Sequence, residues 1–151
     1  MRGLPRIVSI QNAYNLTDRH FEIGMDEVCF RENVGLIAYS TLDFGQLSGK
    51  YIDNPKTRGR MTLFTSDWMM HYRRPAVLDA TRRYVELARD NGMTPAQLSL
   101  AWCYSRWFID ATVIGATQMS HLQENIDAID ISDEIVDHIN GIHASITNPA
   151  L

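Results

Sequence analysis

Short apolar runs and longer stretches of helical periodicity alternate along the chain. The apolar runs are rich in β-branched and aliphatic residues, and polar or glycine residues bound them, which is typical of buried parallel strands. They cover residues 6–10, 34–39 and 111–114. Because the first run ends at Gln11 and Asn12, polar side chains stand where a strand would deliver them to a site. The pattern therefore predicts three strands.

Apolar positions three and four residues apart predict five helices around these strands. Each helix is expected to bury one apolar stripe. The stripes comprise Phe21, Met25, Val28 and Cys29; Val77, Thr81, Tyr84, Val85 and Ala88; Leu98, Ala101, Trp102 and Ser105; Met119, Leu122, Ile126 and Ile129; and Ile135, Ile139, Ile142 and Ile146.

Polar residues at the starts of these helices are expected to cap them. Thr17 or Asp18 stands before the first helix, and Ser132 stands before the last. The clearest signal is at Thr94, because Gln97 follows it at the spacing of a capping box.

The segment of residues 40–74 is rich in Gly, Asp, Thr and Arg and shows no sustained periodicity. A loop this long inside a compact domain is usually functional. Trp68, Met69, Met70 and Tyr72 are therefore candidates for lining a pocket or a lid, and packing of the loop against the protein is the alternative.

The order of the elements is that of a parallel α/β protein, because a helical crossover separates each strand from the next. Three parallel strands leave a sheet with two open edges. A closed (β/α)8 barrel needs at least ~200 residues, whereas this sequence has 151. We therefore expect part of a larger sheet rather than a closed one.

Composition and charge argue against several classes of partner. The chain is 45% hydrophobic and 21% charged, with a net charge of −4 and a pI near 5.7. It therefore lacks a broad cationic field for nucleic acid or an anionic membrane. It shows neither a signal-peptide pattern nor an apolar run of ~18 residues. Cys29 and Cys103 stand far apart, which favours free thiols, and we expect a cytoplasmic protein.

Three blocks of the sequence resemble the aldo-keto reductase superfamily, in particular the bacterial reductases related to potassium-channel β subunits. Residues 7–16 resemble the sixth barrel strand and its turn, residues 35–51 the seventh strand and its loop, and residues 113–126 the eighth strand and the following helix. The resemblance implies a partial (β/α)8 TIM-type barrel, about strands six to eight with their helices and a C-terminal helix, in one domain over residues 1–151. It also implies NADPH as the cofactor.

The resemblance implies nicotinamide-binding roles for two residues on the strands. Gln11 corresponds to a glutamine that hydrogen-bonds the carboxamide, and Tyr39 to an aromatic residue that stacks on the ring. Taken alone, Gln11 would be a polar strand end and Tyr39 a core residue.

The loop after the second strand corresponds to the segment that folds over the cofactor pyrophosphate. Hydroxyl groups, backbone N–H groups and fixed cations can meet phosphate oxygens there. The residues concerned are Ser40, Leu42, Leu47, Lys50 and Arg60. Without the resemblance, the two cations would be solvated loop charges.

The region after the third strand corresponds to the adenosine end of the site. Gly115 and Thr117 match a turn where backbone and hydroxyl approach the ribose or its 2′-phosphate, and Glu124 and Asn125 match the pair that hydrogen-bonds the adenine amino group. His121 stands where arginine or glutamine commonly meets the adenine or the 2′-phosphate, and a solvent-facing histidine is the alternative. NADPH is expected, and NADH stays possible.

No catalytic or metal-binding residue is expected in this sequence. In the family, a proton-donating tyrosine, a lysine, an aspartate and a histidine precede the sixth strand, and no residue here stands in those motifs. His138 and His143 are five residues apart on a helix, so they face different directions and do not form a shared metal site.

Three hypotheses follow for the function. The chain is the C-terminal cofactor-binding part of an NADPH-dependent reductase whose full-length form reduces small aldehydes or ketones. Alternatively, it is a stand-alone nucleotide-binding or regulatory module that forms oligomers through its open sheet edges. The third hypothesis is an inactive truncated product. The substrate is not specified, because most of the loops that shape a barrel pocket belong to other strands.

Overall fold

Three parallel strands form the sheet of this protein. The computed structural model of the chain describes residues 3–64, 67–128 and 130–150. The strands β1 (Ser9–Ala13), β2 (Gly35–Tyr39) and β3 (Ile109–Thr112) lie in the order β1-β2-β3. Both pairs are parallel, so the α/β class with a parallel sheet is confirmed.

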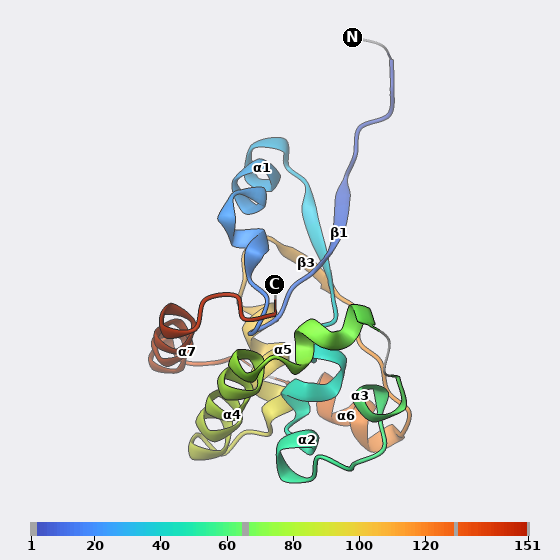
Figure 1. Cartoon of the computed structure of the whole chain (residues 1–151). Helices are drawn as coiled ribbons and strands as arrows, with labels where there is room; N and C mark the ends of the chain where they lie inside the picture. Colours follow the sequence, from blue (N-terminus) through green and yellow to red (C-terminus); the bar gives the residue numbers. More distant parts are fainter. Residues whose placement is uncertain (1–2, 65–66, 129, 151) are drawn as a thin grey trace.

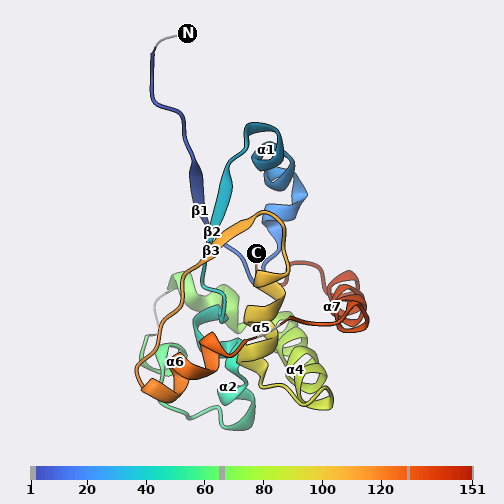
Figure 2. The ribbon, with the colours of Figure 1, turned by 180° about the vertical axis from the view of Figure 1, so that it is seen from behind.

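Helices pack around this sheet as Figures 1 and 2 show. The strands run toward the half of the molecule that holds α2, α3, α5 and α6, and α1 lies beside their opposite ends. The helices and 3-10 turns are η1 (His20–Ile23), α1 (Met25–Glu32), η2 (Asp43–Ser48), α2 (Lys50–Asp53), α3 (Arg60–Leu63), η3 (Asp67–Arg73), α4 (Pro75–Asp90), α5 (Pro95–Tyr104), α6 (Met119–Ile126) and α7 (Asp133–Ser145).

The first strand begins later than the apolar run of residues 6–10 predicts. Its ladder starts with Ser9 opposite Gly35. Residue Asn33, which ends α1 in the left-handed conformation, prevents β2 from starting earlier. Ile7 and Val8 therefore lie in an extended segment with most of their surface exposed.

The third strand is likewise displaced from residues 111–114. It pairs with β2 only as far as Thr112 opposite Ala38, and the N–H of Val113 makes one more bond to the Ala38 carbonyl. Beyond that point β2 ends and the chain turns at Ser40, which has a positive φ of 55°. Ile114 consequently has no partner on the ladder.

The predicted cap of the first helix is wrong. Helix α1 begins at Met25 behind Gly24, which has a φ of 154°, and no side chain caps it. The hydroxyl of Thr17 contacts Asn15 and Asp43 instead, and Asp18 contacts His20. These contacts fix an irregular turn where the sequence pattern indicated a helix start.

The caps and buried stripes of the later helices are largely confirmed. Thr94 and Gln97 form a complete capping box at α5, and the Ser132 side chain accepts from the N–H of Ile135 at α7. The predicted stripe of α4 is entirely buried. In the stripe of α5, Ser105 is the exception and is exposed.

The predicted stripe of α6 is not buried. Met119 is 77% exposed and Ile126 is 63% exposed, whereas Leu122 is half-buried. Ile129 lies outside the described residues. The helix contacts α5 through one side, and no described element covers its apolar side.

The segment of residues 40–74 contains the helical elements η2, α2 and α3 and the turn η3, where the sequence pattern indicated an irregular loop. Each element has four to seven residues. Elements this short give no sustained periodicity, and positive φ angles at Phe44, Gly45 and Gly49 interrupt them.

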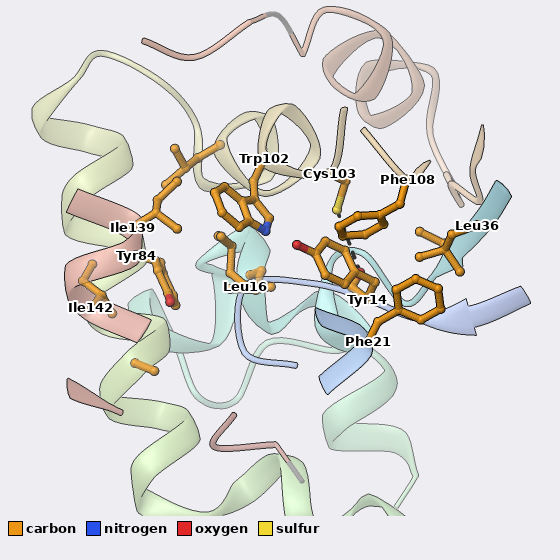
Figure 3. Packing of buried hydrophobic residues seen from close by; sticks show 14 of the residues in the cluster. Tyr14, Leu16, Phe21, Leu36, Tyr84, Trp102, Cys103, Phe108, Ile139 and Ile142 are labelled. Carbon is orange, nitrogen blue, oxygen red and sulfur yellow. Dashed lines mark hydrogen bonds between the residues drawn. The ribbon is translucent and has the colours of Figure 1, made fainter. Parts of the chain in front are cut away.

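The main core lies between one face of the sheet and the helices α4, α5 and α7. Leu36 and Ala38 of β2 are fully buried there. Figure 3 shows the Tyr14 ring beside Phe108, and their centroids are 5.3 Å apart in an edge-to-face arrangement. Burying a side chain of this size stabilises the fold by about 1.5–3 kcal/mol. The core also contains the two cysteines, which are free thiols as expected.

Candidate functional site

Gln11 and Tyr39 lie on the face of the sheet that points away from the core. Side chains alternate along a strand, and Leu36 and Ala38 of β2 point into the core. Tyr39 therefore points to the other face and is 38% exposed. Because Ala13 is opposite Tyr39 in the parallel register, Gln11 shares that open face, where it is exposed.

The chain turns sharply after β2 and begins the loop at the carboxyl ends of the strands. Ser40 and Asp43 both have positive φ, 55° and 47°. The N–H of Asp43 donates to the Ser40 carbonyl at 2.8 Å, and the side-chain amide of Asn15 donates to the same carbonyl at 3.0 Å. The turn is thus attached to the segment that follows β1.

Lys50 and Arg60 lie near Gly45 and Phe44, the residues that follow this turn. A Cβ on Gly45 would lie 3.1 Å from the Lys50 Nζ, and one on Gly59 would lie 2.9 Å from it, so the ammonium group lies between two glycines. The Arg60 guanidinium lies 5.8 Å from the centroid of the Phe44 ring. Within the described part of the chain, neither cation forms a salt bridge with a carboxylate.

The two leucines of the predicted pyrophosphate segment differ in burial. Leu47 is 1% exposed and belongs to the main core, so its side chain anchors the loop to the protein. Leu42 is half-buried, and its carbonyl accepts from the N–H groups of Gly45 and Leu47 at 2.8 and 3.2 Å. Both leucines shape the turn that precedes Lys50.

Gly115 and Thr117 lie in the exposed connection between β3 and α6. A Cβ at Gly115 would meet no protein atom within 4 Å. Packing within this chain therefore does not require glycine here, and the open space is compatible with a ligand close to the backbone.

Helix α6 carries the remaining predicted site residues. His121 is exposed and Glu124 is half-buried. Asn125 is 2% exposed, and its side-chain nitrogen is buried without a hydrogen-bond partner in the described structure. The Tyr104 hydroxyl donates to the backbone carbonyl of Asn125 at 3.5 Å and holds this end of the helix against α5.

The aromatic and methionine residues late in the loop have mixed environments. Met69 and Tyr72 belong to a second apolar cluster with Tyr51, Met61 and Val77, which supports the packing alternative for these two. Met70 is 53% exposed. The Trp68 side chain lies outside the described residues.

Sequence reasoning did not identify Asp43 as a residue of interest. Its carboxyl group is fully buried, and its Oδ1 atom has no hydrogen-bond partner in the described structure. Burial raises the pKa of Asp43 to about 7, and the nearby Asp18 adds to this, although the hydrogen bond with Thr17 opposes it. A polar residue inside a glycine-rich turn was the available signal, but the pattern gives no sign of burial.

Neither a metal cluster nor a membrane span emerges from the described residues. No three His, Cys, Asp or Glu side chains among them gather in a way that could hold a metal ion. None of the helices in those residues is long and apolar enough to cross a membrane.

The sequence profile of the Aldo/keto reductase family matches residues 1–144. The chain belongs to the aldo/keto reductase family. Its relatives include protein Tas of Escherichia coli strain K12, which is 41% identical over 97% of this chain and 43% of its own length. An aldo-keto reductase of Babesia bovis is 34% identical over 97% of this chain and 55% of its own length.

The potassium-channel branch of the resemblance is also confirmed. A putative voltage-gated potassium channel subunit beta of Schizosaccharomyces pombe is 32% identical over 87% of this chain and 40% of its own length. The fold matches that of a glycerol dehydrogenase from Gluconobacter oxydans with a TM-score of 0.75 at 20% identity, over 97% of this chain and 45% of the other. The chain thus spans about half the length of the aldo/keto reductases that it matches.

Proposed function

We propose that this chain forms the cofactor-binding part of an NADPH-dependent aldo-keto reductase, as strands six to eight of a (β/α)8 barrel with their helices. The main support is the shared face of Gln11 and Tyr39 at the carboxyl ends of the strands, next to a loop with two cations, Lys50 and Arg60, that form no salt bridge among the described residues. The cations can bind the anionic phosphates of NADPH, and Tyr39 can stack on its flat nicotinamide ring.

Each predicted residue then has one task. Bound NADPH would supply the hydride for carbonyl reduction. Gln11 would hydrogen-bond the carboxamide, and Tyr39 would fix the ring face that is presented to a substrate. Lys50 and Arg60 would hold the pyrophosphate together with the backbone around Ser40 and Leu42, and Leu47 would anchor that loop.

The adenosine end would bind between the β3–α6 connection and α6. Gly115 would allow close approach of backbone to ribose, and the Thr117 hydroxyl would reach the 2′-phosphate. Glu124 and Asn125 would accept hydrogen bonds from the adenine amino group through their side-chain oxygens. His121 would face the 2′-phosphate or the adenine, and NADH stays possible because no arginine stands at that position.

The proposal also concerns what acts with this chain. The proton donor and its partner residues would come from protein outside it, and the substrate would be a small aldehyde or ketone. The two edge strands β1 and β3 would be covered by that protein or by another copy of the chain. We propose the cytoplasm as its location.

Calorimetric titration with NADPH tests the proposal. We expect Lys50→Ala and Arg60→Ala to weaken binding by about tenfold each, the effect of losing a charge-assisted hydrogen bond. Tyr39→Ala should weaken it about fivefold through lost stacking. The wild-type chain should not oxidise NADPH when an aldehyde is added.

The matched control is Lys56→Ala, which removes an exposed cation from the same loop. It should leave the affinity within about twofold, because an isolated exposed charge contributes little. If Lys56→Ala and Lys50→Ala lowered the NADPH affinity equally, the effect would come from general charge attraction and not from a specific contact of Lys50. Absence of NADPH binding by a folded wild-type chain would disprove the cofactor assignment.

A further inference from the structure

Three side chains form a short hydrogen-bonded chain between the turn after β1 and the loop after β2. The Thr17 hydroxyl oxygen lies 2.8 Å from the Asn15 side-chain oxygen and 2.9 Å from Oδ2 of Asp43. Asn15, Thr17 and Asp43 are all at most 3% exposed, so water does not compete for these contacts.

The orientation of the Asn15 amide is fixed by other contacts. Its side-chain oxygen accepts from the N–H groups of Thr17 and Asp18 at 2.9 and 3.0 Å. Its side-chain nitrogen donates to the Ser40 carbonyl at 3.0 Å. Because a flipped amide would lose all three bonds, the atom that faces the Thr17 hydroxyl is an acceptor.

The Thr17 hydroxyl has a single hydrogen for two oxygen neighbours. If Asp43 were ionised, both neighbours would be acceptors and one short contact would have no hydrogen. If Asp43 is protonated, its hydroxyl donates to Thr17, and Thr17 donates to Asn15. With Asp43 protonated, each close contact among Asn15, Thr17 and Asp43 has one hydrogen. This form also places no net charge in a buried site.

We propose that Asp43 acts as a neutral carboxylic acid that positions the cofactor-binding loop, by donating to Thr17 and so fixing the turn from Ser40 to Asp43 against the segment after β1. This inference rests on the proposed function, since the same turn contains Ser40 and Leu42 and leads to Lys50. Ionisation of the carboxyl group would break the chain of hydrogen bonds and loosen the loop.

The charged neighbours of Asp43 favour the neutral form. On the turn after β1, Asp18 raises its pKa through like charge, and Asp18 is itself paired with His20. On η3, Tyr72 is the titratable neighbour, and burial is the main cause that raises the pKa of that phenol to about 12, so it is neutral near pH 7. Among the described residues, no cation contributes to the pKa shift of Asp43.

The direction of the pH dependence follows from the raised pKa. Asp43 has an ordinary value of 3.8 and a folded value of about 7. Its stabilising contribution is complete below the ordinary value and is lost as the pH rises toward the folded value. The carboxyl group itself ionises in the folded protein around pH 7, and the loop should loosen over the same range.

Two measurements on the folded chain test this inference without NADPH. Carbon-13 NMR of labelled aspartate carboxyl groups should show one signal with a midpoint near pH 7, and Asp43→Asn should remove that signal. Amide-exchange protection factors for residues 40–49 should fall about fivefold from pH 6 to pH 8 in the wild type, the effect of one lost hydrogen bond. A carboxyl midpoint near 4 for Asp43 would overturn the inference.

NADPH titration of the same proteins completes the test. From pH 6 to pH 8 the wild-type affinity should fall about fivefold relative to Asp43→Asn, whose amide can still donate to Thr17 at any pH. At each pH, the affinity of the wild type is compared with that of Asp43→Asn, so ionisation of the 2′-phosphate affects both proteins alike. Asp53→Asn, which removes an exposed carboxylate paired with Arg89, should behave as the wild type. Identical pH dependence in the wild type and Asp43→Asn would refute the positioning role.

The outcomes separate the two proposals. If no protein binds NADPH but the carboxyl midpoint and the loop protection change together near pH 7, the proposed cofactor fails and the positioning role of Asp43 stands. If NADPH binds and its affinity does not depend on Asp43, the cofactor assignment stands and the positioning role of Asp43 fails. Thr17→Val provides a second variant, because it removes the acceptor of the Asp43 proton and should raise loop exchange at pH 6.

Discussion

Arg19 shows how single side chains hold the turn after β1 in place. Its guanidinium forms two bonds to the Glu22 carboxylate at 2.9 and 2.7 Å and a third to the Asn140 side chain at 3.0 Å. It also lies 4.5 Å from the centroid of the Trp102 ring. Arg19 thereby connects the segment after β1 with α5 and α7. The same segment contains Asn15 and Thr17, which contact Asp43.

Replacing Arg19 by methionine should lower the free energy of unfolding by about 2 kcal/mol, because the partly buried Glu22 carboxylate loses two charge-assisted hydrogen bonds. Chemical denaturation measures this change. The matched control is Arg31→Met, since Arg31 pairs with Glu27 across an exposed face of α1, and it should change stability by at most ~0.5 kcal/mol. Similar effects for both variants would contradict the role given to Arg19.

The pH dependence of this effect follows from Glu22. Burial raises the pKa of its carboxyl group, but hydrogen bonds from Arg19 and Tyr14 outweigh burial, and the pKa lies below its usual value of 4.5. Its contribution is therefore present above that value and is lost as the pH falls. The stability difference between the wild type and Arg19→Met should shrink below about pH 4.5.

At the scale of elements, the connection from β3 to α6 is the most exposed segment of the proposed site among the described residues. The connection from β3 to α6 is exposed over residues 113–118, and Gly115 has free space on all sides that a Cβ would occupy. This open backbone leaves room for the ribose or phosphate that we propose to bind here.

Gly115→Ala separates stability from binding. The free energy of unfolding should change by less than about 0.5 kcal/mol, because the added methyl group meets no protein atom. NADPH affinity should fall by about tenfold if the ribose or phosphate approaches this backbone, since a methyl group would displace it. Calorimetric titration next to a denaturation curve gives both numbers. Unchanged affinity would remove Gly115 from the site.

The elements themselves were predictable where local rules decide them. The α5 capping box and the α4 stripe follow from residue spacing, because burial on one side of a helix imposes a period of 3.6 residues. The ends of β1 and β3 were not predictable, because the ladder extends only as far as Gly35 and Tyr39 of β2 allow. The exposed stripe of α6 was missed for a similar reason, since spacing cannot show whether a neighbour is present.

At the scale of the molecule, the sequence indicated the parallel order of the sheet and its open edges. The cofactor-binding residues were predicted from family motifs rather than from geometry, and they stay predictions. Asp43 and Thr17 could not be assigned in this way, because their roles depend on a contact between segments 26 residues apart in the chain. Such contacts are set by the fold and leave no periodic signal.

The parts of the proposed site lie far apart in the sequence. Gln11, the turn from Ser40 to Gly45, the β3–α6 connection and Asn125 belong to four segments of the chain. They are proposed to contact one extended ligand. If these segments responded to NADPH at different concentrations, the motifs would not form a common site.

The most direct test is to follow the backbone amide signals of the labelled chain by NMR while NADPH is added. We predict that signals of residues 11–12, 40–45, 115–117 and 124–125 shift together with a single dissociation constant, and that signals of α1 and α7 stay in place. Shifts confined to α1 or α7, or no saturable shifts at all, would contradict this prediction.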